Sequence, residues 1–173
     1  MADPRLARVL EALRSSQFAD LKGARISASI PIAERLLNDL IAAALPASGA
    51  LRTVTVQPLA GNRLKATVKL ARPEFLPAIP LTLEIEQQPQ LRPAESPLVL
   101  RVLSLPGLVT LASSVLSMTT LLPEGLKFED QRLFVDVPTL LKRAGYGEVL
   151  PFLDSLNAAT EENRLIVDAT LRV

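Results

Sequence analysis

One segment, residues 25–46, changes its hydrophobic period from that of a strand to that of a helix with no loop between the two. Residues 25–31 alternate isoleucine and alanine with serine, which is typical of a half-buried β-strand. The following run, 32–45, is helical in period, and its only polar side chains are Glu34, Arg35, Asn38 and Asp39. These four lie on one stripe, so the rest of the helix surface is aliphatic. We therefore expect this helix to line an apolar interior that the protein alone need not fill.

Strict alternation of apolar and polar residues then predicts four strands in succession, with no helix between them. Their expected ranges are 51–58, 62–71, 79–87 and 97–105. The tripeptide AGN at 60–62 is a signal for a tight hairpin turn. Since alternation means that one face is buried and the other is wet, these strands indicate an antiparallel sheet.

The second half of the chain mixes both periods. A second apolar helix is expected over 106–121. After it we expect strands at 125–129 and 132–137, helices at 138–144 and 147–158, and a final strand at 163–173. This final strand ends the chain, so it must pair with a strand far back in the sequence. Asp136 and Asp168 fall in strands between apolar neighbours, where parity points them toward solvent.

The first residues form a separate element. Residues 4–18 carry a narrow apolar stripe with arginines on the opposite face, which predicts an amphipathic helix. We divide the chain into this N-terminal helix, 1–20, and a single α+β domain, 21–173. Two roles stay open for the helix, packing on the edge of the domain or docking on a membrane or a partner.

Composition excludes several classes of function. The chain has no cysteine and no histidine, which removes disulfides, thiolate nucleophiles, the usual zinc sites and a histidine general base. No motif of nucleophilic catalysis, phosphate binding or paired acids occurs, so we expect no enzyme, no metal and no cofactor. The formal net charge of +1 disfavours nucleic acid as a partner. No run reaches the ~20 apolar residues of a membrane span, and no signal peptide is recognisable, so we expect a soluble cytoplasmic protein.

One strand is basic. Arg63, Lys65 and Lys69 share parity in the strand 62–71 and project from its outer face. One interpretation is contact with anionic headgroups at a membrane surface. The other is cross-strand pairing, in which Lys65 lies opposite Glu86 and Lys69 lies diagonal to Glu84.

Two stretches carry a family resemblance. The apolar helix contains LLNDLI, and LLPEGLKFEDQRLFVDVPTLL at 121–141 has an LP dipeptide, two short strands and an apolar–Asp–apolar pair that leads into a helix. Together with the long meander, this resembles the small bacterial proteins of the TULIP-like (tubular lipid-binding) group. The resemblance implies an α+β fold in which a curved, mostly antiparallel sheet wraps around a long apolar helix, with a second apolar helix beside it. A cystatin-like roll is the alternative fold, although the long C-terminal half argues against it.

The resemblance implies an elongated apolar groove for acyl chains. The side chains expected to face a common apolar volume there are Leu36, Leu40, Leu83, Ile85, Leu100, Val102, Leu111 and Val115. A 14-residue helix spans ~21 Å and an 8-residue strand ~26 Å, lengths that suit an extended acyl chain. We therefore expect a lipid-binding or lipid-transfer module whose ligand is a lipid or fatty acid and which touches membranes peripherally. The alternative is a protein-interaction or scaffold domain of the same architecture with a fully packed core.

Overall fold

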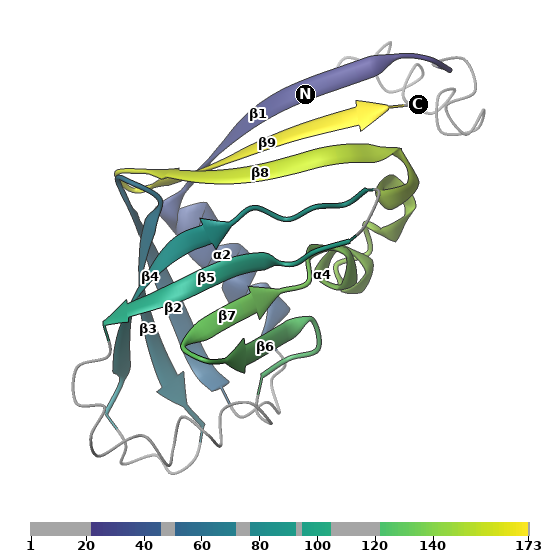
Figure 1. Cartoon of the computed structure of the whole chain (residues 1–173). Helices are drawn as coiled ribbons and strands as arrows, with labels where there is room; N and C mark the ends of the chain where they lie inside the picture. The colour runs from purple at the N-terminus through teal and green to yellow at the C-terminus, as the bar shows by residue number, and fades with distance from the viewer. Residues whose placement is uncertain (1–21, 46–50, 72–76, 93–94, 105–121, 173) are drawn as a thin grey trace, which may run out of the picture.

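The computed structural model describes residues 22–45, 51–71, 77–92, 95–104 and 122–172, and these form two antiparallel sheets with few helices (Figure 1). The fold is therefore of the α+β class with mostly antiparallel strands. The expected helices 4–18 and 106–121 lie outside the described residues, as do Leu111 and Val115.

The larger sheet has six strands in the order β2-β3-β4-β5-β7-β6 and curls into a half-barrel (Figure 1). Its strands are β2 (Leu51–Leu59), β3 (Arg63–Leu70), β4 (Ile79–Gln87), β5 (Leu98–Ser104), β6 (Leu126–Glu129) and β7 (Arg132–Val135). The predicted hairpin at 60–62 is confirmed, with Gly61 and Asn62 at φ of 80° and 60°. Glycine and asparagine adopt such left-handed values at low cost, which is why a tight turn forms there.

The smaller sheet has three strands in the order β1-β9-β8. Its strands are β1 (Arg25–Ala33), β8 (Leu153–Glu161) and β9 (Arg164–Arg172). The expectation that the last strand pairs far back in the sequence is confirmed, because β9 pairs with β1 in an unbroken register from Arg25–Arg172 to Ala33–Arg164. Asp168 is exposed, as its parity predicted.

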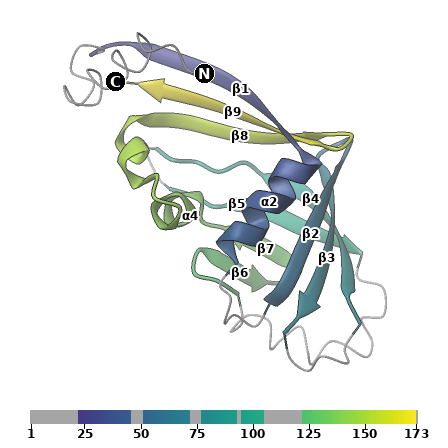
Figure 2. The same cartoon turned by 180° about the vertical axis from the view of Figure 1, so that it is seen from behind.

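Helix α2 (Glu34–Ala44) follows β1 directly. It begins two residues later than the sequence predicted, because the β1–β9 ladder holds the chain extended through Ala33. The helix lies against β2 on the side toward which the six-stranded sheet curls (Figure 2). No described helix is long and apolar enough to cross a membrane.

Two expectations for the C-terminal half are wrong. Residues 147–158 do not form one helix, because a short 3-10 helix η2 (Gly147–Phe152) with Pro151 inside it ends where β8 begins. Asp136 is not a strand residue. It is the N-cap of helix α4 (Val137–Arg143), and its Oδ1 accepts a hydrogen bond of 3.1 Å from the Thr139 N–H. Such a cap satisfies a donor that the first turn of a helix leaves free.

Candidate functional site

Helix α2 has two different apolar faces. Leu37, Ile41 and the C-cap Leu45 are half-buried, on the side of the helix that carries Asn38. Leu36 and Leu40, one turn apart on another side of the helix, are 51% and 52% exposed. Uncovered leucine surface is unfavourable in water by roughly 25 cal/mol per Å². The helix thus carries a stripe of apolar surface that no described part of the chain covers.

Asn38 fixes the position of this stripe. Its Nδ2 donates to the Val56 carbonyl oxygen at 2.9 Å, and its Oδ1 accepts from the Val56 N–H at 2.7 Å. The same Nδ2 also donates to the Glu34 oxygen at 3.0 Å within the helix. Val56 lies in the edge strand β2, so one side-chain amide replaces a neighbouring strand at that point. This role was not predicted, because in the sequence Asn38 is only one of four polar residues on the helix.

One face of the half-barrel is aliphatic. Leu83, Leu100 and Val102 are between 5% and 7% exposed and belong to one buried cluster with residues of β3. Ile85 is partly buried and packs against that cluster. The structure thus brings together four of the expected groove residues on β4 and β5. Leu36 and Leu40 are not among the side chains packed on this cluster.

Strand β3, which carries the three basic residues, pairs with β4 in a register that differs from the predicted one. Arg63 lies opposite Glu84, and Lys65 lies opposite Thr82. The predicted pairing of Lys65 with Glu86 is therefore wrong, and the diagonal pairing of Lys69 with Glu84 is wrong with it. The observed register sets Leu64 beside Leu83, whereas the predicted one would have placed Leu64 opposite Gln87. Burial of the apolar pairs decides the register, and the charged pairs follow.

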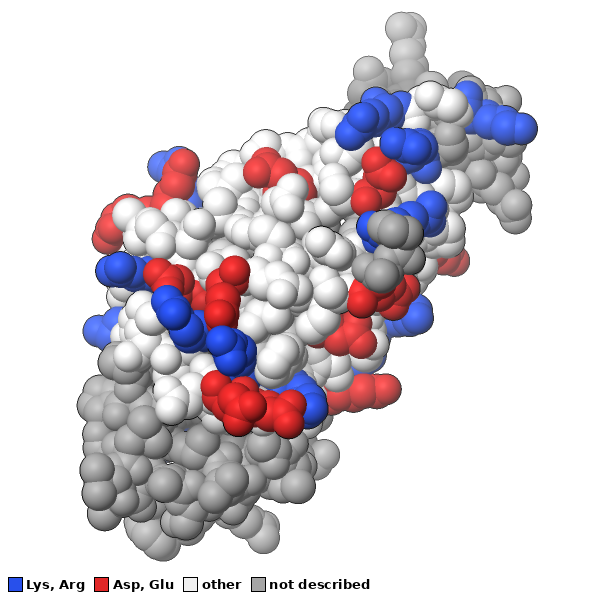
Figure 3. All heavy atoms as spheres, viewed as in Figure 1, with Lys and Arg blue, Asp and Glu red and all other residues white. Residues whose placement is uncertain are grey.

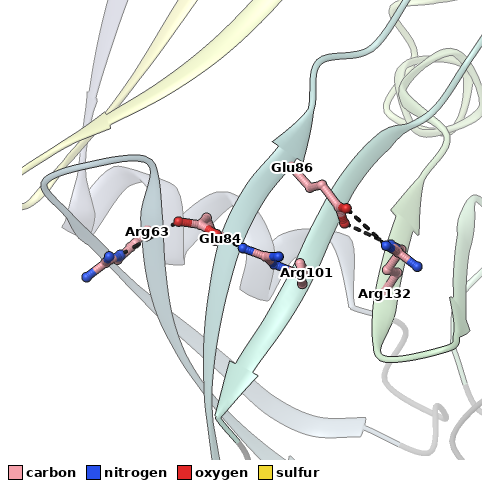
Figure 4. A network of polar contacts seen from close by, with 5 residues as sticks. All are labelled: Arg63, Glu84, Glu86, Arg101 and Arg132. Atoms are coloured by element: carbon pink, nitrogen blue, oxygen red, sulfur yellow. Dashed lines mark hydrogen bonds and ion pairs between the residues drawn. The ribbon is translucent and has the colours of Figure 1, made fainter.

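Ion pairs cross the outer face of the same sheet (Figure 4). Glu84 lies between Arg63, at 3.9 Å, and Arg101, at 2.5 Å. Glu86 accepts two hydrogen bonds from Arg132, of 2.8 and 3.0 Å. These hydrogen bonds hold the pKa of Glu86 below its usual range and raise that of Arg132. The sequence showed the parity of these residues, but their partners depend on the register.

The outer face therefore mixes both signs of charge (Figure 3). The charge of Arg63 is partly neutralised by Glu84. Lys65 and Lys69 form no ion pair with another described residue. Of the three predicted headgroup-binding residues, these two lysines keep the charge that an anionic surface would attract.

A hollow of about 380 Å³ lies between β6, β7 and the start of α4. Its lining includes Glu95, Lys127 and Asp136. A neighbouring hollow of about 340 Å³ lies between α4, η2 and the side chains of Leu91, Arg92 and Glu95. None of the expected groove residues lines either hollow. Both are lined by a mixture of charged and apolar side chains, which is unlike the mostly apolar lining that an acyl chain requires.

No protein-family model, curated protein or solved structure matches this chain.

Proposed function

We propose that the protein binds an acyl chain of a lipid or fatty acid along the exposed stripe of α2. The observation that carries the proposal is the exposure of Leu36 and Leu40 on a helix whose other side is held against β2 by Asn38. A helix that is tied in place yet keeps leucines uncovered offers a preformed surface for an apolar ligand.

Burial of the acyl chain alone can supply the binding free energy, so the proposal does not require a polar specificity site. Transfer of an acyl chain out of water yields about 0.8 kcal/mol per buried CH₂, or up to ~12 kcal/mol for about fifteen methylenes before ordering costs. The stripe from Leu36 to Ala44 runs ~12 Å along the helix axis, at 1.5 Å per residue, so it covers only part of such a chain and the binding energy is correspondingly smaller. The role is one of binding and not of catalysis, since a chain without histidine and cysteine lacks the commonest nucleophile and base pairs.

Lys65 and Lys69 extend the proposal to the membrane from which a lipid would be taken. Each lysine near an anionic bilayer contributes about 1 kcal/mol of attraction, so two of them favour a weak and reversible contact. Such a contact suits a protein that exchanges lipid with a membrane and then leaves it.

A single tryptophan can report on the proposed site, because the chain has none of its own. Leu40→Trp places an indole on the exposed stripe, where a half-exposed position accommodates the larger ring. Addition of a dibrominated stearic acid should quench its fluorescence, since bromine quenches only on close contact. Tyr146→Trp is the matched control, because Tyr146 is 61% exposed and lies between α4 and η2, outside the proposed stripe.

Saturable quenching in Leu40→Trp without quenching in Tyr146→Trp supports an acyl site on α2. Equal quenching of both variants, or of neither, overturns it.

A second candidate function, that of a protein-interaction domain, is favoured by a separate observation: strand β1 is exposed along almost its whole length.

A further inference from the structure

Strand β1 is the outer strand of the three-stranded sheet, with β9 on one side and no described strand on the other. Both views show the first part of β1 as the strand of this sheet furthest from the half-barrel, while its end runs into α2 (Figures 1 and 2). All its residues are exposed except Ile32, and Ile26 and Ile30 are 45% and 49% exposed. A long, apolar, uncovered edge is a template for pairing with another strand.

The other described edges of the two sheets are closed or short. At β2, Asn38 binds both backbone groups of Val56. At β8, Gln88 does the same for Ala158, with two hydrogen bonds of 2.8 Å, and Asn62 accepts from the Thr160 N–H at 3.2 Å. Strand β6 has only four residues, two of them charged. Among the described edges, β1 alone is both long and without such a cover.

The register shows which backbone groups of β1 point outward. The Glu34 N–H donates to the Asn163 oxygen at 3.0 Å, at the position that continues the β1–β9 pairing. Bonded and non-bonded pairs alternate along an antiparallel ladder, so the even-numbered residues of β1 turn their backbone toward β9. The odd-numbered residues turn theirs outward, Ser27 and Ser29 among them.

Two further features agree with this assignment of inward and outward backbone groups. Pro31 is odd-numbered, so its missing N–H falls on the outer edge, where a proline is tolerated. The Ser27 and Thr170 hydroxyls lie 3.2 Å apart, as expected for a non-bonded pair, whose side chains approach closely. The outer edge thus offers both N–H and C=O at Ser27 and Ser29, and only C=O at Pro31.

The sequence of β1 is self-complementary in this phase. If a second copy pairs antiparallel about Ala28, Ser27 of one copy faces Ser29 of the other, and each exchanges N–H and C=O with its opposite. Ile26 then lies beside Ile30 of the second copy on the same face. Arg25 faces Pro31, whose lack of an N–H falls at the end of the ladder and before α2 begins.

This pairing also continues the apolar face of the sheet. Ile26, Ala28 and Ile30 lie beside Leu171, Ala169 and Val167 of β9. Two-fold pairing through β1 joins this face to its copy in one six-stranded sheet, which is the isologous contact that closed dimers use. We propose that two copies of the chain associate through their β1 edges, antiparallel and centred on Ala28. This inference does not depend on the acyl-chain site.

Disulfide trapping tests the register directly, because the chain has no cysteine. A non-bonded pair at the centre sets the two Ala28 Cα atoms about 4.5 Å apart, within the span that a disulfide bridges. Ala28→Cys should therefore form a covalent dimer on mild oxidation of the full chain. Asp168→Cys is the matched control. It is exposed on the neighbouring strand β9, but three strand spacings, ~14 Å, separate it from its copy.

Loss of one outward N–H tests the edge contact. Ser29→Pro removes that group, which the β1–β9 ladder does not use, while Ser29→Thr keeps it. In analytical ultracentrifugation the unmodified chain and Ser29→Thr should sediment as dimers at micromolar concentration. Ser29→Pro should weaken the dimer about tenfold or more, because each of the two copies loses the hydrogen bond that its Ser29 N–H donates across the contact. Far-UV circular dichroism identifies a variant that has not folded.

Self-pairing is supported by cross-linking of Ala28→Cys without Asp168→Cys, together with the loss of dimer in Ser29→Pro. It is overturned by a chain that stays monomeric at every concentration, which would leave the edge for a strand of another protein. It is also overturned by a dimer that tolerates Ser29→Pro, or by failure of Ala28→Cys to cross-link. The trapping result decides the question even where Ser29→Pro does not fold.

Discussion

Replacement of Asn38 by alanine removes the side chain that ties α2 to the edge of β2. Two hydrogen bonds between the elements are lost, at 2.9 and 2.7 Å, together with one bond inside the helix. The Val56 N–H and carbonyl oxygen then depend on water. We expect lower stability and a looser α2, and with it a less well-defined position for Leu36 and Leu40.

The magnitude follows from these contacts. Each of the two inter-element hydrogen bonds contributes about 0.5–1.5 kcal/mol net, so their loss costs about 1–3 kcal/mol. Alanine is a better helix former than asparagine by up to ~0.7 kcal/mol, which offsets part of this loss. Val56 is half-buried, so water can replace some of the lost partners. The free energy of unfolding should therefore fall by about 1–2 kcal/mol.

Asp39→Ala is the matched control on the same helix. The Asp39 carboxylate lies 4.0 Å from Arg35, and both side chains are largely exposed, so this ion pair contributes little. Asparagine and aspartate have similar helix propensities, so the difference between the two variants isolates the Asn38 tie. Urea unfolding followed by far-UV circular dichroism measures both. If Asn38→Ala loses less than ~0.5 kcal/mol more than Asp39→Ala, the tie contributes nothing of note and the reasoning fails.

Three further predictions concern the rest of the molecule. Gly125→Ala should lower the free energy of unfolding in urea by about 1–3 kcal/mol, because Gly125 has a φ of +91° and a new Cβ would meet side chains of α4 at 3.1 and 3.2 Å. A loss below ~0.5 kcal/mol contradicts this. Arg132 lowers the pKa of Glu86, so their pairing stabilises the fold above the unfolded glutamate pKa of about 4.3, and this stability is lost as pH falls through the lower folded value. Arg132→Met should therefore destabilise at pH 7 and have little effect at pH 2, and equal losses at both pH values would refute the assignment. Lys65→Glu with Lys69→Glu should reduce salt-sensitive sedimentation with phosphatidylserine vesicles, and unchanged binding would exclude the two lysines as the contact.

The strands of the half-barrel were predictable because their alternation is strict and their turns are marked. The expected strand 79–87 coincides with β4, and the turn at Gly61 and Asn62 lies where the sequence placed it. Register was not predictable in the same way. A slip of four residues between β3 and β4 keeps every side chain on its face, so alternation alone cannot exclude it.

Strand β8 shows a second limit. Val149, Leu150, Leu153 and Leu156 follow helical spacing, which favoured a helix over 147–158. In the structure β9 pairs with residues from Leu153 onward, so a long-range ladder overrides the local period. The hydrogen bonds from side-chain amides to the edge strands β2 and β8 could not be predicted either. Asn38, Gln88 and Asn62 act on strands distant in the sequence, and nothing local marks a polar side chain for that role.

The candidate site was predictable in part. The apolar character of α2 and the inward parity of Leu83, Leu100 and Val102 follow from periodicity, and the structure gathers those three in one buried cluster. The exposure of Leu36 and Leu40 could not be read from the sequence, because it depends on which side of the helix Asn38 turns toward β2.

Native mass spectrometry of freshly purified protein, with lipid extraction of the same sample, tests the proposed acyl-chain site most directly. The account predicts a mass above that of the polypeptide by one lipid or fatty acid, with the same molecule in the extract. It also predicts that Leu36→Lys with Leu40→Lys abolishes the excess while the protein stays folded, since both side chains are half exposed. A spectrum at the polypeptide mass alone, unchanged after incubation with palmitate, would contradict the account.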